Sequence, residues 1–252
     1  MKKILRYIGL GLVITLLLGV FGFLVWASTP ARPEAIAIES LAAARVDEER
    51  NWLVFTPEDA EPTAGLVLYP GGRVDYRAYA PHAKAIAEGG FTVVIVPMPL
   101  NFAFLDVNRA GDVIAAFPEI ETWAVGGHSL GGAMAAEFAK SNPSSVDGLV
   151  LWASYPAENT DFSDSNLPVL SIFASKDQVA SLEEIEDSRS RLPEETQFIQ
   201  IDGGNHAGFG WYGNQNGDGS LEISKMNSKI KSQQPPAISC RTSVRIKGSG
   251  IR

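Results

Sequence analysis

The sequence has few residues that bind metals or form covalent cross-links. Its 252 residues include one cysteine, Cys240, and three histidines. A single cysteine cannot form an internal disulfide, and it excludes a cysteine-rich zinc module. Hydrophobic residues make up 45% and charged residues 20%, a balance that excludes general disorder and a polytopic membrane protein. The length allows one medium domain or two small ones.

Acidic residues are missing from both ends of the chain. Residues 1–30 carry three bases and residues 223–252 carry seven, without any acid. All 29 acids lie in residues 31–222, against 11 bases. Such an acidic body repels a phosphate backbone, so we expect no nucleic-acid partner.

The first long hydrophobic run predicts contact with a membrane. Ile8–Ala27 contains no charge, and as a helix its 20 residues reach about 30 Å, the thickness of the hydrocarbon core of a bilayer. Lys2, Lys3 and Arg6 precede it. Because basic flanks stay in the cytoplasm, residues 28–252 should lie on the extracytoplasmic side of the cell membrane.

Two fates of this run remain open. A signal anchor stays in place as residues 1–27, whereas a signal peptide is cleaved, here after Ala27, and leaves a secreted protein. The run is longer than the apolar region of about 7–15 residues usual in signal peptides, which favours the anchor. Residues 28–45 are rich in proline and alanine and are predicted to form a linker.

The body alternates short apolar runs with helical patterns. Strands are predicted at residues 52–55, 65–69, 91–96, 123–125, 149–152, 169–173 and 198–201, and helices at 79–88, 108–117, 130–141 and 181–191. Continuous apolar strands separated by helices indicate an α/β fold with a mostly parallel sheet and helices on both faces. The domain should cover residues 46–222, and the short connection between residues 152 and 167 leaves no room for a large lid.

A serine stands between one strand and the next helix. Gly127-His128-Ser129-Leu130-Gly131 matches G-x-S-x-G in the context that this motif requires. Glycines two positions before and after the serine avoid clashes with the crowded turn. The N–H of Leu130, at the positive end of the helix, is a candidate donor to an oxyanion. The alternative is a glycine-rich turn with a buried serine.

A serine nucleophile needs a base and an acid, in the chain order Ser, acid, His. His206 follows the last strand and is the predicted base. The other two histidines are less suitable, because His82 is predicted to lie on the surface of a helix and His128 should point away from Ser129. Asp177 follows an apolar strand and is the predicted acid. Other aspartates between Ser129 and His206 are less well situated: Asp161, Asp164 and Asp202.

The second oxyanion donor is expected in the turn Pro70-Gly71-Gly72-Arg73, after the strand at 65–69. The Gly72 N–H is the first candidate and that of Arg73 the second, because glycine lets the backbone approach a substrate oxygen. The Arg73 side chain is a possible contact for a carboxylate-bearing substrate. A solvated arginine is the simpler alternative.

Together these blocks resemble the α/β-hydrolases, in particular the small lid-less fold-5 branch related to dienelactone hydrolases. The matching blocks are residues 68–74 with 79–81, 126–132, 174–177 and 203–213. The resemblance implies a serine hydrolase without metal or cofactor, acting on a carboxylic ester through Ser129, Asp177 and His206. Dienelactone hydrolases proper use a cysteine, so that particular reaction is not expected here.

Three questions stay open from sequence. An acyltransferase uses the same triad, and a non-catalytic surface protein can retain it. The absent lid favours a small-molecule acyl substrate, small or exposed, over a long lipid. The basic tail, residues 223–252, lacks the amphipathic helix that usually closes this fold. It is predicted to be disordered, either as a segment that binds a partner or lipid or as the product of a frame shift.

Overall fold

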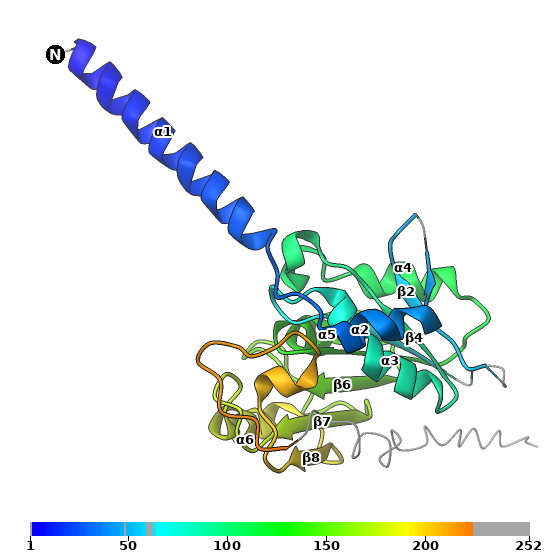
Figure 1. The fold of residues 1–252 in the computed structure, drawn as a ribbon. Coiled ribbons are helices and arrows are strands. Elements are labelled where there is room, and N and C mark those ends of the chain that lie inside the picture. Colours follow the sequence, from blue (N-terminus) through cyan, green and yellow to red (C-terminus); the bar gives the residue numbers. More distant parts are fainter. Residues whose placement is uncertain (1, 48, 59–61, 63, 224–252) are drawn as a thin grey trace, which may run out of the picture.

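The computed structural model describes residues 2–47, 49–58, 62 and 64–223. A long helix, α1 (Lys2–Ala27), projects from a layered α/β body (Figure 1). The predicted basic tail lies outside the described residues, apart from Ile223.

One eight-stranded sheet forms the centre of the body, in the order β1-β2-β4-β3-β5-β6-β7-β8. Within the described residues, the pairs β1–β2 and β2–β4 are antiparallel and the other neighbouring pairs are parallel. The sheet is therefore mostly parallel, as predicted. The strands are β1 (Arg45–Val46), β2 (Leu53–Phe55), β3 (Ala64–Tyr69), β4 (Phe91–Ile95), β5 (Trp123–His128), β6 (Gly148–Trp152), β7 (Val169–Ala174) and β8 (Gln197–Ile201).

Helices cover both faces of the sheet, with α2 and α3 on one face and α4 and α5 on the other (Figure 1). The α-helices after α1 are α2 (Ala35–Ser40), α3 (Ala80–Ala87), α4 (Arg109–Ala116), α5 (Leu130–Ser141) and α6 (Leu182–Ser188). Short 3-10 helices are η1 (Leu41–Ala43), η2 (Tyr76–Tyr79), η3 (Pro99–Asn101), η4 (Ala103–Leu105), η5 (Arg189–Arg191) and η6 (His206–Phe209).

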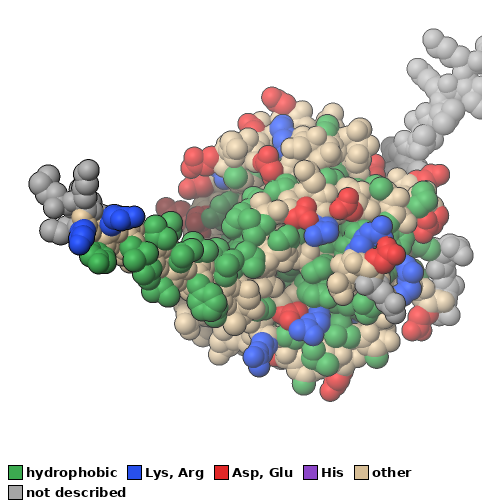
Figure 2. All heavy atoms as spheres, turned by 90° about the horizontal axis from the view of Figure 1, so that it is seen from above, with side chains coloured by type: hydrophobic (Ala, Val, Ile, Leu, Met, Phe, Trp, Pro, Cys, Tyr) green, Lys and Arg blue, Asp and Glu red, His purple; other side chains and the backbone are tan. Residues whose placement is uncertain are grey.

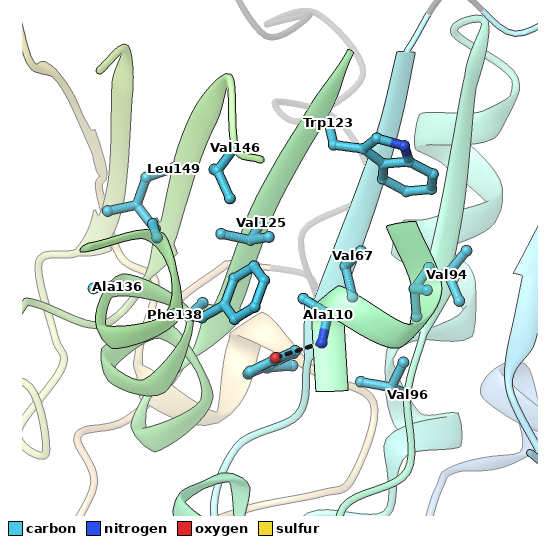
Figure 3. Packing of buried hydrophobic residues seen from close by; sticks show 14 of the residues in the cluster. Val67, Val94, Val96, Ala110, Trp123, Val125, Ala136, Phe138, Val146 and Leu149 are labelled. Carbon is cyan, nitrogen blue, oxygen red and sulfur yellow. Dashed lines mark hydrogen bonds between the residues drawn. The ribbon is translucent and has the colours of Figure 1, made fainter. Parts of the chain in front are cut away.

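Each face of the sheet carries its own apolar core, because the central strands are buried on both sides. All six residues of β3 and of β7 are buried, which explains their continuous apolar sequences. Figure 3 shows one core, in which Val67, Val125 and Trp123 of the sheet pack near Phe138 of α5. This core fixes the positions of the strands whose carboxyl ends carry the candidate site.

Residues 28–45 differ from the predicted linker. They contain α2, η1 and the start of β1, and Ala37 is completely buried. The Ala31 N–H donates to the Arg73 carbonyl, and the Glu34 N–H to the Trp211 carbonyl. Small alanines let this segment pack closely against the body, a property that an alanine- and proline-rich composition does not reveal.

Helix α1 is long and apolar enough to cross a membrane. Its segment Arg6–Ala27 has 22 residues and a mean hydropathy of 2.6, and none of its apolar window is buried against the body. A membrane anchor and a signal sequence share these properties. The connection between β6 and β7 carries no helix or strand, so no large lid is present in the described part of the chain.

Candidate active site

Ser129 lies on a strained turn between β5 and α5. Its φ is 53° and its ψ −126°, a conformation that costs a non-glycine residue free energy and recurs at functional sites. The Ser129 carbonyl accepts hydrogen bonds from the Gly132 and Ala133 N–H groups at 3.0 and 3.2 Å and from Ser154 Oγ at 2.7 Å. The backbone of α5 thus holds the serine in this conformation.

The flanking glycines are required by close packing, as predicted. A Cβ on Gly127 would lie 2.5 Å from the Gly131 carbonyl carbon. A Cβ on Gly131 would lie 2.4 Å from the carbonyl oxygens of Tyr69 and Pro70. Real Cβ atoms do not approach backbone so closely, so the turn admits no side chain at either position.

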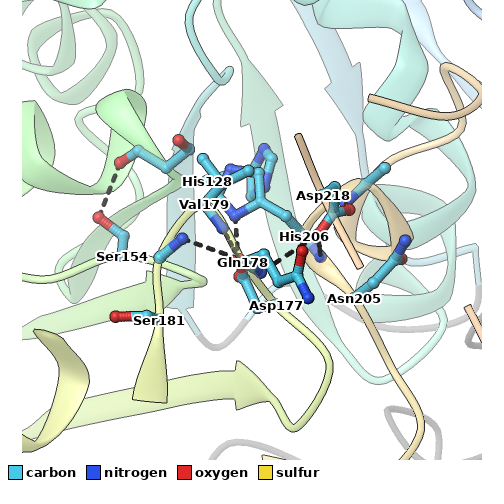
Figure 4. A network of polar contacts seen from close by, with 12 residues as sticks. His128, Ser154, Asp177, Gln178, Val179, Ser181, Asn205, His206 and Asp218 are labelled. Carbon is cyan, nitrogen blue, oxygen red and sulfur yellow. Dashed lines mark hydrogen bonds and ion pairs between the residues drawn. The ribbon is translucent and has the colours of Figure 1, made fainter. Parts of the chain in front are cut away.

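Asp177 and His206 form a buried pair at the carboxyl ends of β7 and β8 (Figure 4). His206 Nδ1 lies 2.8 Å from Asp177 Oδ2, and both side chains are buried. Asp177 Oδ1 accepts the Val179 and Ala180 N–H groups, each at 2.8 Å. The carboxylate is therefore fixed at both oxygens, and it orients the imidazole with Nε2 directed away from it.

The structure leaves the distal nitrogen of His206 without a partner. His206 Nε2 is buried and has no hydrogen bond within the described part of the chain, which includes Ser129. The ring of His128, the residue before Ser129, lies 4.5 Å from the His206 ring between centroids. Ser129 and His206 thus belong to the same region at the carboxyl edge of the sheet. Catalytic hydrogen bonds often form only in the complex with substrate.

Two backbone N–H groups adjoin this region. The Leu130 N–H is the first of α5 and has no partner within its helix. A Cβ on Gly72 would lie 3.1 Å from Leu130 Cδ2, so the turn after β3 faces the start of α5. The Arg73 N–H donates to the Asn101 carbonyl at 2.8 Å. Of the two predicted donors in that turn, this leaves Gly72 as the candidate.

The Arg73 side chain contacts the end of α1, and within the described part of the chain it has no hydrogen bond or ion pair with Asp177 or His206. Its guanidinium lies 3.9 Å from the centroid of the Trp26 ring, and it donates to the carbonyls of Trp26 and Thr29 at 3.2 and 2.8 Å. These interactions occupy the group that the sequence suggests as a substrate contact. They give Arg73 a structural role at the junction of helix and body.

Sequence reasoning missed Tyr79. Its hydroxyl accepts the Gly71 N–H at 2.9 Å and lies 2.8 Å from His128 Nδ1. Burial raises the pKa of Tyr79 above its ordinary value, so the hydroxyl stays neutral. Tyr79 therefore links the turn of Gly72 to the residue before Ser129. The block Tyr79-Ala80-Pro81 contributes to the resemblance to the family, but no local pattern indicates this contact.

Asp218 was also missed. Its carboxylate accepts the backbone N–H groups of His206 at 3.1 Å, Ala207 at 2.9 Å and Gln178 at 3.4 Å. It therefore joins the loop of Asp177 to the loop of His206 (Figure 4). Asp218 lies 12 residues beyond His206 in a polar, glycine-rich stretch, where an aspartate carries no signal in sequence.

The other two histidines are buried, and for His82 this corrects the prediction of a surface residue. His82 is 4% exposed and packs edge-on against Trp152, with centroids 5.6 Å apart. Burial lowers the pKa of His82 to about 4. Burial first, and the neighbouring His206 ring second, hold the pKa of His128 well below its ordinary value. Both therefore stay neutral at neutral pH.

A mostly parallel sheet with a strained serine between strand and helix, and with a buried Asp–His pair at the same carboxyl edge, is typical of the α/β-hydrolases. The sequence agrees with the fold: the model of the alpha/beta hydrolase family, in its fold-5 branch, matches residues 65–230. The chain belongs to this family. No curated protein matches it.

Solved structures show the same fold at low identity. An alpha/beta hydrolase enzyme, MGS-MChE2, from the sediment metagenome of the Mar Chica lagoon in Morocco has 17% identity and a TM-score of 0.53, over 65% of this chain and 90% of that one. The esterase domain of a Rhodothermus marinus protein has 15% identity and a TM-score of 0.52, over 65% and 87%. Est1E from Butyrivibrio proteoclasticus, solved with ferulic acid, has 11% identity and a TM-score of 0.52, over 62% and 86%.

Proposed function

We propose that this hydrolase is a membrane-anchored serine esterase that cleaves a carboxylic ester through Ser129, His206 and Asp177. The observation that carries the proposal is the buried Asp177–His206 pair, which lies at the same carboxyl edge of the sheet as the strained Ser129. All three histidines have an Nε2 without a partner among the described residues, but His206 alone among them is paired there with a carboxylate. A general base needs both features: a carboxylate that orients the ring and a free nitrogen that can take the serine proton.

The reaction follows from this arrangement. Ser129 Oγ attacks the ester carbonyl carbon while its proton passes to His206 Nε2, and the N–H groups of Leu130 and Gly72 stabilise the oxyanion. The C–O bond to the alcohol then breaks, and the alcohol leaves with the proton from His206. Water gives a proton to His206 and attacks the acyl carbon; the bond from that carbon to Ser129 Oγ then breaks, and His206 returns the proton to Oγ, which releases the acid and the free serine.

Retention of α1 as an anchor is supported by contacts on both sides of the candidate cleavage site. Ala27 is completely buried, and its carbonyl accepts a hydrogen bond from Asn101 Nδ2 at 2.9 Å. Arg73 stacks on Trp26 and bonds to Thr29. Cleavage after Ala27 would remove Trp26 from Arg73 and Ala27 from Asn101, and would leave Arg73 its hydrogen bond to Thr29. The lost contacts favour the anchor over a secreted protein.

The serine is tested with a fluorophosphonate probe on the full-length protein in detergent. We expect one covalent adduct at Ser129 and loss of hydrolysis of p-nitrophenyl acetate by about 10⁴-fold or more in Ser129→Ala. Ser190→Ala, which alters an exposed serine of η5, should keep both the labelling by the probe and the rate of p-nitrophenyl acetate hydrolysis. Full ester turnover by a folded Ser129→Ala protein would show that another nucleophile acts.

A further inference from the structure

The end of α1 is held rigidly beside the turn that contains Gly72. Ala27 is buried and bonded to Asn101 of η3, while Arg73 stacks on the Trp26 ring. Trp26 also lies 6.0 Å from Phe102 between ring centroids. A helix on a flexible tether leaves the orientation of its domain open, whereas these contacts fix it.

The same segment touches the candidate oxyanion turn. Asn101, which holds Ala27 through its side chain, accepts the Arg73 N–H through its carbonyl at 2.8 Å. A Cβ on Gly72 would lie 3.8 Å from Phe102 Cδ1. One loop, residues 99–105, thus contacts both the end of the apolar helix and the backbone beside the proposed reaction centre.

This loop carries exposed apolar side chains. Phe104 is 49% and Leu105 47% exposed, and Trp26 is 48% exposed. The Phe102 and Phe104 rings pack together at 5.1 Å. We call Trp26, Phe102, Phe104 and Leu105 the junction patch. The space-filling view shows hydrophobic surface running from α1 onto the adjoining part of the body (Figure 2).

The position of the helix determines what covers this patch. If α1 spans the bilayer, Trp26 at its end lies at the interface, where amphipathic rings are enriched. Phe102, in ring contact with Trp26, and the neighbouring Phe104 and Leu105 then lie at the same depth. Burial of apolar side chains in the boundary between headgroups and acyl chains lowers the free energy.

We propose that the junction patch is seated in the membrane interface and that the substrate is an ester lipid of the same bilayer. This inference rests on the proposed esterase function. The ester groups of a lipid lie at the depth of the interface, so a carbonyl carbon can reach Ser129 while the acyl chain keeps its contact with apolar surface. The substrate is then an amphiphile, and not the small or exposed molecule suggested by the absent lid.

The seating is tested by depth measurement, independently of chemistry. Full-length protein with Cys240→Ser and Phe104→Cys, labelled with bimane, is reconstituted into phosphatidylcholine vesicles. We expect quenching by lipids that carry a nitroxide on the acyl chain. A label introduced by Val46→Cys, at an equally exposed position on β1, should not be quenched. Absence of quenching at position 104 would overturn the seating.

The substrate class is tested by comparing two esters. The double variant Phe104→Ser with Leu105→Ser should hydrolyse p-nitrophenyl acetate as the wild type does, and dioleoylglycerol in vesicles about 10-fold more slowly or worse. The matched control Val46→Ser should leave both rates unchanged. Both changed residues are exposed, so folding should not suffer.

The outcomes separate the two proposals. If wild-type protein cleaves neither ester, the esterase function fails, whereas the depth measurement still decides the seating. If it cleaves p-nitrophenyl acetate but not dioleoylglycerol, the lipid substrate is wrong and the esterase function stands. If the double variant slows both esters equally, the patch acts on the fold of the site and the inference about the membrane is overturned.

Discussion

The two halves of the candidate site are built by different means. Asp177 and His206 are held by hydrogen bonds between side chain and backbone, including those of Asp218. Ser129 is held by close packing of backbone, with glycines at Gly127 and Gly131 that admit no Cβ. We call Asp177 and His206, the proposed acid and base, the base half, and Ser129, the proposed nucleophile, the nucleophile half. The base half is a polar network on loops, and the nucleophile half is a closely packed joint between strand and helix.

This difference predicts two kinds of failure. A polar network loses function when one partner changes, while the surrounding core keeps its packing. A crowded backbone joint cannot accept new atoms without moving the strand or the helix, so folding and chemistry suffer together. Substitutions confined to one half should therefore separate the two kinds of failure.

The largest effect within the base half is expected from Asp177→Asn. The amide keeps the volume of the carboxylate but cannot stabilise the imidazolium, and it favours the wrong tautomer of His206. We expect kcat for p-nitrophenyl acetate to fall by about 10³-fold or more, with little change in melting temperature. A retained kcat would exclude Asp177 as the acid.

On the nucleophile side, Gly131→Ala should lower activity by about 10²-fold and also lower the melting temperature. The new Cβ would meet the Tyr69 and Pro70 carbonyl oxygens at 2.4 Å, so β3 or α5 must shift and move Ser129. Gly111→Ala is the matched control, because its Cβ would meet only Phe138, at an ordinary 3.6 Å. Equal melting temperatures for the two variants would refute the crowded joint.

A smaller effect is expected from Asp218→Asn, about 10-fold in kcat with KM nearly unchanged. The carboxylate oxygens accept hydrogen bonds from several backbone N–H groups. In the amide, an NH₂ donor replaces one of these oxygens and faces a backbone N–H donor, so a hydrogen bond is lost and the His206 loop is held less firmly relative to Asp177. Asp187→Asn, at an exposed position on α6, is the control. A change confined to melting temperature would make Asp218 a structural residue only.

Much of the architecture could be predicted because it depends on local pattern. Buried parallel strands give continuous apolar runs, and in this fold the strands are followed by the residues proposed for chemistry. Ser129, Asp177 and His206 each follow a strand, and the structure brings the last two into contact. Ser129 follows β5 at the same carboxyl edge of the sheet. The alternation of elements indicates a parallel sheet and hence a shared edge, but it does not give the order of the strands.

The remaining features depend on contacts between distant segments. Asp218 and Tyr79 act through backbone groups of other loops, and nothing in their neighbouring residues indicates those partners. Residues 28–45 pack because Ala37 is small, whereas the same composition is typical of linkers. The predicted surface position of His82 is wrong because the residues next to it in sequence do not indicate that two distant tryptophans, Trp152 and Trp211, pack against it.

His82 differs from His206 in having no carboxylate partner among the residues that the structure describes. His82 Nε2 is buried without a hydrogen bond to any described residue, and burial lowers the pKa of this histidine to about 4. In the unfolded chain, His82 binds a proton as the pH falls below its ordinary pKa of about 6.5. In the folded protein, His82 stays neutral until the pH falls to about 4. The unfolded state therefore binds more protons in this window, and stability falls as the pH falls.

Between pH 7 and pH 5, His82 should lower the free energy of unfolding by about 2 kcal/mol, and above pH 7 it should add almost no pH dependence. Urea unfolding of the full-length protein in detergent measures this loss. His82→Phe and His82→Gln should both reduce the loss between the two pH values, whatever their stability at pH 7, because neither side chain titrates. The dependence that remains comes from other groups, including His128, whose pKa burial also lowers. If both variants lose as much stability on acidification as the wild type, protonation of His82 is not its cause.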